Sequence, residues 1–80
     1  MRTDPFRPSL AVSERAEIVR RAVEALPDEL RRPLILAEYE EKQHAEIAVI
    51  LDCSVKAVET RIYRARQRLR VSLSKLLQTV

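Results

Sequence analysis

The basic side chains of this chain are concentrated in its second half, where they could bind phosphate groups. From Thr60 to the C-terminus there are six Lys or Arg residues and no Asp or Glu. Residues 41–80 carry eight basic and four acidic side chains, a balance of +4, whereas residues 1–40 carry seven basic and eight acidic ones, a balance of −1. Guanidinium groups stay charged and donate several hydrogen bonds, so they suit phosphates and base edges. The asymmetry predicts a polyanion partner, against the alternative of a solvated helix face.

The segment that positions these arginines has the pattern of a helix-turn-helix. Residues 46–51 form a short apolar stretch, residues 52–54 a tight turn, and a long amphipathic stretch follows. Ala48 is small enough to let a second helix approach, Asp52 accepts a left-handed backbone more readily than most residues, and Val58 is a branched apolar plug. In such a unit the second helix lies in the DNA major groove.

A projection of the second helix at about 100° per residue separates an apolar face from a polar one. We expect the buried stripe to contain Val58, Ile62, Ala65, Leu69, Leu73 and Leu76. The opposite face and its flanks supply hydrogen-bond donors for bases and phosphates. The candidate DNA-binding residues are Lys56, Ala57, Thr60, Arg61, Tyr63, Arg64, Gln67 and Arg68.

The rest of the chain predicts three further helices, which makes the fold class all-α. Residues 1–11 are expected to be a flexible tail or linker remnant, and residues 12–80 one domain. The helices are expected at 12–26, with Ser13 as N-cap, at 28–40, at 43–51 and, capped by Ser54, at 54–77. Pro33 would remove a hydrogen bond, so the α-helix proper of the second segment is expected to begin near Arg31.

Composition argues against several other classes of protein. Gly is absent and hairpin patterns are missing. Cys53 is the only cysteine and His44 the only histidine, so no intrachain disulfide, metal site or other cofactor is expected. No enzyme motif is recognisable, and no apolar run of about 18 residues or signal peptide is found. We therefore expect a cytoplasmic protein that is not an enzyme.

The spaced elements of residues 12–77 together resemble region four of the extracytoplasmic-function sigma factors. The residues that carry the resemblance are Leu26-Pro27, Arg31, Pro33-Leu34-Ile35-Leu36, Glu46-Ile47-Ala48, Leu51, Cys53-Ser54, Val58, Arg61-Ile62-Tyr63-Arg64-Ala65-Arg66 and Leu69-Arg70. The resemblance implies a four-helix domain that reads the promoter −35 element and docks on the flap of the RNA polymerase β subunit. It also implies an anti-sigma factor as a partner, and no membrane or small-molecule substrate.

Several positions depart from the pattern of that family. Glu41 and Asp52 stand where the family usually has Gly, Gln43 replaces a Ser or Thr cap, and Glu59 stands where Lys is common. Region two of the family is not in this sequence, so we expect either a fragment of a longer sigma factor or a lone domain. The departures leave open a sigma mimic that binds an anti-sigma factor. The output domain of a response regulator is a further alternative.

Overall fold

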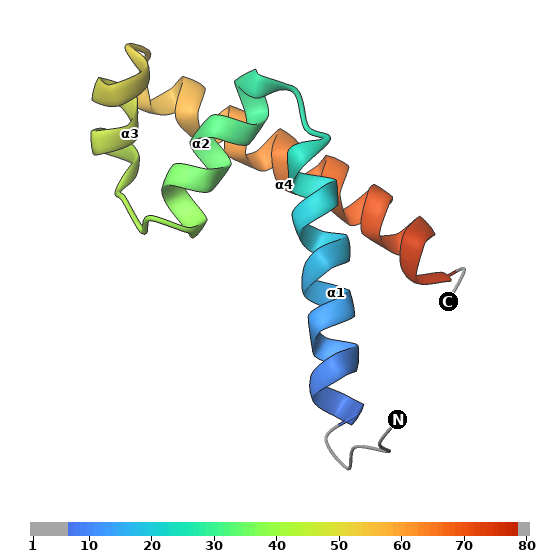
Figure 1. Ribbon diagram of the computed structural model, residues 1–80. Coiled ribbons are helices and arrows are strands. Elements are labelled where there is room, and N and C mark those ends of the chain that lie inside the picture. The colour runs from blue at the N-terminus through green and yellow to red at the C-terminus, as the bar shows by residue number, and fades with distance from the viewer. Residues whose placement is uncertain (1–6, 79–80) are drawn as a thin grey trace.

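The computed structural model describes residues 7–78, and the side chains within residues 14–75. The four helices are α1 (Arg7–Glu24), α2 (Asp28–Glu38), α3 (His44–Leu51) and α4 (Val55–Gln78). No strand occurs between residues 7 and 78, so the predicted all-α class is confirmed. Helix α4 packs against each of the other three (Figure 1).

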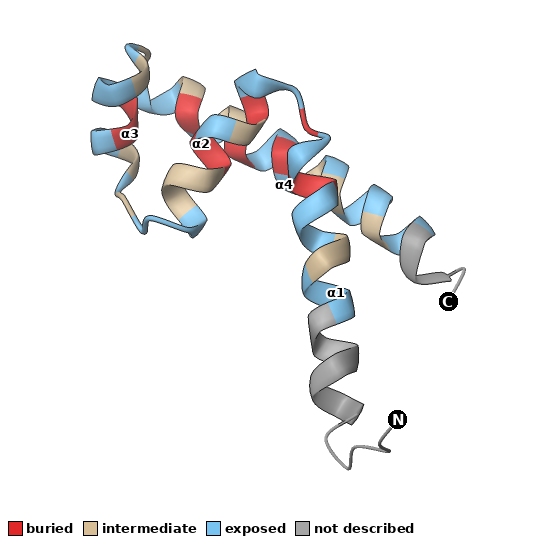
Figure 2. Cartoon of the chain, in the orientation of Figure 1, coloured by how far each residue is buried: buried red, intermediate tan, exposed pale blue. Residues whose placement is uncertain are grey.

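The hydrophobic core lies where α2, α3 and the end of α1 meet the first half of α4. Figure 2 shows the buried positions gathered in this region, while the later turns of α4 are largely exposed. The core contains Val23, Leu26, Leu30, Leu34, Ile47, Ala48, Val58, Ile62 and Ala65. The predicted stripe of α4 is therefore buried at its first three positions. Leu69 and Leu73 are only half-buried, and the Leu76 side chain lies outside the described part of the chain.

Helix α1 begins earlier than predicted. It starts at Arg7, so Ser13 lies inside the helix and is not its N-cap. Pro8 does not prevent this start, because an N–H in the first turn of a helix has no intrahelical partner to lose. Of the predicted tail over residues 1–11, residues 7–11 lie in α1 and residues 1–6 fall outside the described residues.

The prediction that α2 begins near Arg31 is also wrong. The helix starts at Asp28, and the Arg31 N–H donates to the Pro27 carbonyl at 2.8 Å in a regular helical bond. Pro33 lies inside the helix and lacks the N–H that would bond to the Glu29 carbonyl. Its side chain is among the fully buried ones, and the burial of the ring offsets part of the lost hydrogen bond.

Candidate nucleic-acid interface

A left-handed residue ends α3 and turns the chain toward α4. Asp52 has φ 55° and ψ 55°, as predicted for the turn position. The Cys53 N–H donates to the Ala48 carbonyl at 2.9 Å, and the Asp52 N–H donates to the Val49 carbonyl at 3.2 Å. This pair of bonds is a Schellman motif, which satisfies carbonyls that the helix end would leave unpaired. The turn therefore fixes the angle at which α4 leaves.

The start of α4 is capped as the sequence predicted. The Ala57 N–H donates to Ser54 Oγ at 3.0 Å, and the Val58 N–H donates to the Ser54 carbonyl at 3.0 Å. Val58 has no exposed surface, and Ala48 of α3 is 7% exposed. A small side chain in α3 thus lets α4 approach closely, and Val58 fills the space between them. Together α3, the turn and α4 form the expected helix-turn-helix.

The beginning of α3 compensates for the poor cap predicted at Gln43. The Gln43 N–H donates to Glu46 Oε1 at 3.2 Å. The carboxylate of Glu46 lies in the first turn of α3, where the helix dipole favours a negative charge. The hydrogen bond to Glu46 therefore makes Gln43 a better N-cap of α3 than its side chain alone would be.

The outward face of α4 carries six of the candidate DNA-binding residues, and three of these six are exposed to solvent. Lys56, Tyr63 and Arg64 are exposed, whereas Thr60 and Gln67 are half-buried, as is Ala57. The Gln67 Nε2 group donates to Tyr63 Oη at 2.6 Å, which ties these two side chains together along the helix. This face joins a phenol, an amide, a hydroxyl and two cations, a set of groups that can contact both base edges and phosphates.

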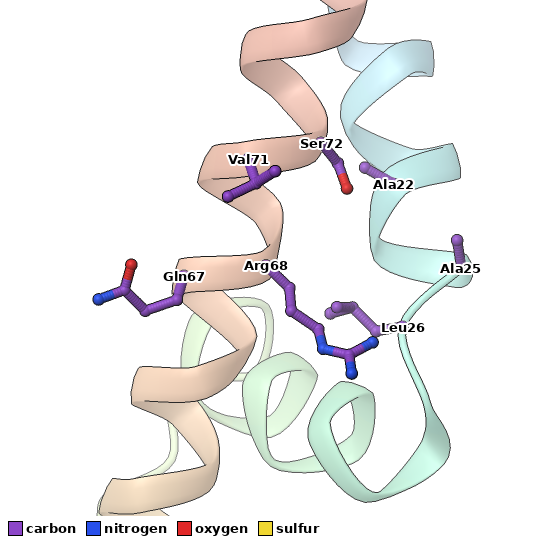
Figure 3. A pocket seen from close by; sticks show the side chains of 7 residues that line it. All are labelled: Ala22, Ala25, Leu26, Gln67, Arg68, Val71 and Ser72. Atoms are coloured by element: carbon purple, nitrogen blue, oxygen red, sulfur yellow. The ribbon is translucent and has the colours of Figure 1, made fainter.

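The flanking arginines are placed differently from one another. Arg61 Nε lies 3.8 Å from Glu29 Oε2, and Arg66 forms an ion pair with Glu38, so both are tied to α2. Arg68 extends toward Leu26 beside α1 (Figure 3). The structure thus places Arg61 and Arg68 at the edges of the outward face rather than at its centre. Sequence spacing could not identify these contacts, because their partners come from other helices.

One acidic residue lies among these cations on α4. Glu59 Oε2 is 3.9 Å from Nδ1 of His44, the first residue of α3. The proximity of Glu59 and His44 could not be predicted from the sequence, because the two residues lie on different helices. Among the described residues there is no cluster of three His, Cys, Asp or Glu side chains that could bind a metal.

No helix within the described part of the chain is long and apolar enough to span a membrane. The thiol of Cys53 is unoxidised and the residue is half-buried in the turn. It packs against the core cluster, in keeping with its expected role as a small apolar residue.

Known proteins match the part of the chain that contains the helix-turn-helix. Residues 16–69 match the family model described as "Sigma-70, region 4". The ECF RNA polymerase sigma-E factors of Escherichia coli and Salmonella typhimurium are 44% identical over 54 residues, which cover 68% of this chain and 28% of those proteins. The RNA polymerase sigma-H factor of Pseudomonas aeruginosa is 37% identical over 60 residues, which cover 75% of this chain and 31% of that protein. The chain therefore spans less than a third of the length of these relatives.

Proposed function

The chain belongs to the sigma-70 region 4 family, of the extracytoplasmic-function type, and on this premise we propose that it recognises the promoter −35 element during transcription initiation. The observation that carries the proposal is the outward face of α4, where Lys56, Tyr63 and Arg64 are exposed to solvent on the second helix of the helix-turn-helix. The family is a class of transcription factors rather than enzymes. The match to sigma region 4 leaves no reason to propose a response-regulator output domain.

In this proposal the first turns of α4 enter the major groove. Thr60 contacts a base edge such as a thymine methyl, and Arg64 pairs with guanine or with a phosphate. Lys56 lies in the first turn of α4, where the helix dipole disfavours a cation, and a nearby phosphate would compensate for this cost. The contact extends along the DNA strand through Tyr63 and Gln67. At its edges lie Arg61, Arg68 and the backbone at Ala57.

We place the docking site for the RNA polymerase β flap in a groove between α1 and α4. Figure 3 shows Ala22 and Leu26 on one side of this groove and Val71 and Ser72 on the other. Its volume is about 370 Å³, and Val71 is 56% exposed although it is apolar. An exposed apolar groove next to the core is suited to an apolar helix or loop of a partner. Val71→Asp should weaken polymerase binding and leave DNA binding unchanged. Val49→Asp, at an exposed position of α3, is the control and should change neither polymerase binding nor DNA binding.

The direct test of DNA recognition is a salt titration with a −35 promoter duplex. If the domain neutralises about four phosphates, the slope of log K against log salt concentration is about −3.6. We expect Arg64→Ala to weaken binding and, if it loses a phosphate contact, to make the slope shallower by about 0.9. Arg15→Ala removes the same charge from the exposed surface of α1 and serves as the control. Equal affinities of the Arg64 and Arg15 variants would overturn the proposal.

A second candidate function is a sigma mimic that binds an anti-sigma factor. The observation in its favour is Glu59, which places a negative charge on the recognition helix. An anti-sigma factor would cover the groove between α1 and α4 and part of the outward face of α4. Capture of the cognate anti-sigma factor, together with no binding to any promoter duplex, would favour this function over the first.

A further inference from the structure

Glu59 is the only acidic residue of α4, and its carboxylate has unused capacity to accept hydrogen bonds. Its side chain is 55% exposed, and the distance from its Oε2 to His44 Nδ1 is 3.9 Å, which is beyond hydrogen-bonding distance. No donor among the described residues bonds to the Glu59 carboxylate. The carboxylate thus lies near α3 without a hydrogen bond to it, and it can accept a hydrogen bond from a donor outside the protein.

The position of Glu59 brings it into the proposed DNA contact. It is the fifth residue of α4, three residues after Lys56 and four before Tyr63, which places all three on one ridge of the helix. The N-terminal residues of a recognition helix are those that reach base edges. A carboxylate at this position must lose water when the helix enters the groove, and burial of a charge without a partner is costly.

The chemistry of the major groove supplies a suitable donor. Cytosine presents its N4 amine, whereas adenine presents the N6 amine beside the N7 acceptor, which repels the second carboxylate oxygen. We propose, resting on the proposed function, that Glu59 is a specificity-determining residue that accepts a hydrogen bond from the exocyclic amine of a cytosine in the promoter duplex. Lys56 lies three residues before Glu59 on the same ridge of α4, and its positive charge offsets part of the repulsion between Glu59 and the phosphates.

The inference is tested by selecting duplexes from a randomised library with the full 80-residue chain and its variants. The wild type should enrich cytosine at one position. Glu59→Gln should replace that cytosine by adenine, because a glutamine amide pairs with adenine N6 and N7 at once. The expected change in the cytosine-to-adenine preference is about tenfold or more. Glu14→Gln removes the same charge from exposed α1 and should keep the wild-type preference.

Two results would count against the inference in distinguishable ways. If Glu59→Gln binds all duplexes more tightly but keeps the wild-type base preference at every position, Glu59 only repels the backbone and the inference is wrong. If the wild type enriches no sequence at all, the proposed promoter recognition fails, and the inference fails with it. The unfolding temperature of Glu59→Gln, which is expected to match the wild type, shows that the variant is folded.

Discussion

Arg61 Nε of α4 lies 3.8 Å from Glu29 Oε2 of α2, so a cation at the edge of the proposed DNA contact already faces a carboxylate. The Arg61 side chain is 30% exposed and that of Glu29 is 66% exposed. A phosphate that approaches this edge must compete with Glu29 for the guanidinium, and the carboxylate also repels it directly. If the domain binds DNA as proposed, we therefore expect Glu29 to lower the contribution of Arg61 to the affinity.

We expect Glu29→Gln to raise the affinity for a promoter duplex by up to about fivefold at low salt, because an exposed ion pair is worth at most about 1 kcal/mol. The gain should shrink at high salt, where exposed charges are screened. Binding of a fluorescent duplex at two salt concentrations measures both effects. Glu14→Gln is the matched control, and a lower affinity of Glu29→Gln would show that the ion pair positions Arg61 for DNA.

The two isoleucines of α3 provide a test of the core. Ile47 has no exposed surface, whereas Ile50 is 49% exposed on the same helix. Ile47→Ala should lower the free energy of unfolding by about 2–5 kcal/mol, because it leaves a cavity between α3 and α4. Ile50→Ala should cost well under half as much, and chemical denaturation of both variants measures the difference. Similar losses would mean that α3 does not pack as described.

The helix-turn-helix could be predicted from sequence because its determinants are local. Asp52, Ser54 and Val58 lie within seven positions of one another, and each acts through backbone conformation, capping or burial. Helix periodicity also predicts which side chains of α4 face inward, along the part of α4 against which the other helices pack. Beyond Ala65 the stripe continues in sequence, but fewer partner residues lie against it, so Leu69 and Leu73 are only half-buried.

The parts that could not be predicted depend on partners far along the chain. Arg66 pairs with Glu38 across 28 positions, and no periodicity links two separate helices. The helical position of Pro33 could not be predicted for the same reason: the lost hydrogen bond is a local effect, whereas the burial that compensates for it comes from tertiary packing. Assignment of the candidate DNA-binding residues to bases or phosphates also needs the DNA itself.

Glu41 is a second left-handed residue, with φ 55°, just before α3. The family position is usually Gly, and a left-handed backbone costs a non-Gly residue about 1–2 kcal/mol. Glu41→Gly should therefore raise the free energy of unfolding by about 0.5–1 kcal/mol, after allowance for the greater freedom of Gly in the unfolded chain. Glu40→Gly is the control, because positive φ is found only at Glu41 and Asp52 among the described non-Gly residues. The control should be neutral or destabilised, and a loss of stability in Glu41→Gly would contradict the strain argument.

Glu17 makes the stability of α1 sensitive to acid. Hydrogen bonds from Arg20, and next from Arg21, lower the pKa of the Glu17 carboxyl from its ordinary value of 4.5. A carboxyl whose folded-state pKa lies below its unfolded value stabilises the fold above the unfolded pKa, and this contribution is lost as the pH falls through the folded pKa. The stabilisation is thus complete at neutral pH, begins to be lost as the pH falls to 4.5, and is lost in full only below the lower folded-state pKa.

The side chain in Glu17→Gln cannot ionise, so the loss of stability of this variant relative to the wild type should follow the same pH dependence. We expect a lower unfolding temperature than the wild type at neutral pH, and a difference that closes as the pH falls below 4.5. Glu14→Gln changes the same charge one turn earlier and separates the effect of the Arg20 and Arg21 contacts from that of net charge. A constant difference between wild type and Glu17→Gln at every pH would show that these contacts do not stabilise α1. The size of the effect should be small and should fall with added salt, because all three side chains are well exposed to solvent.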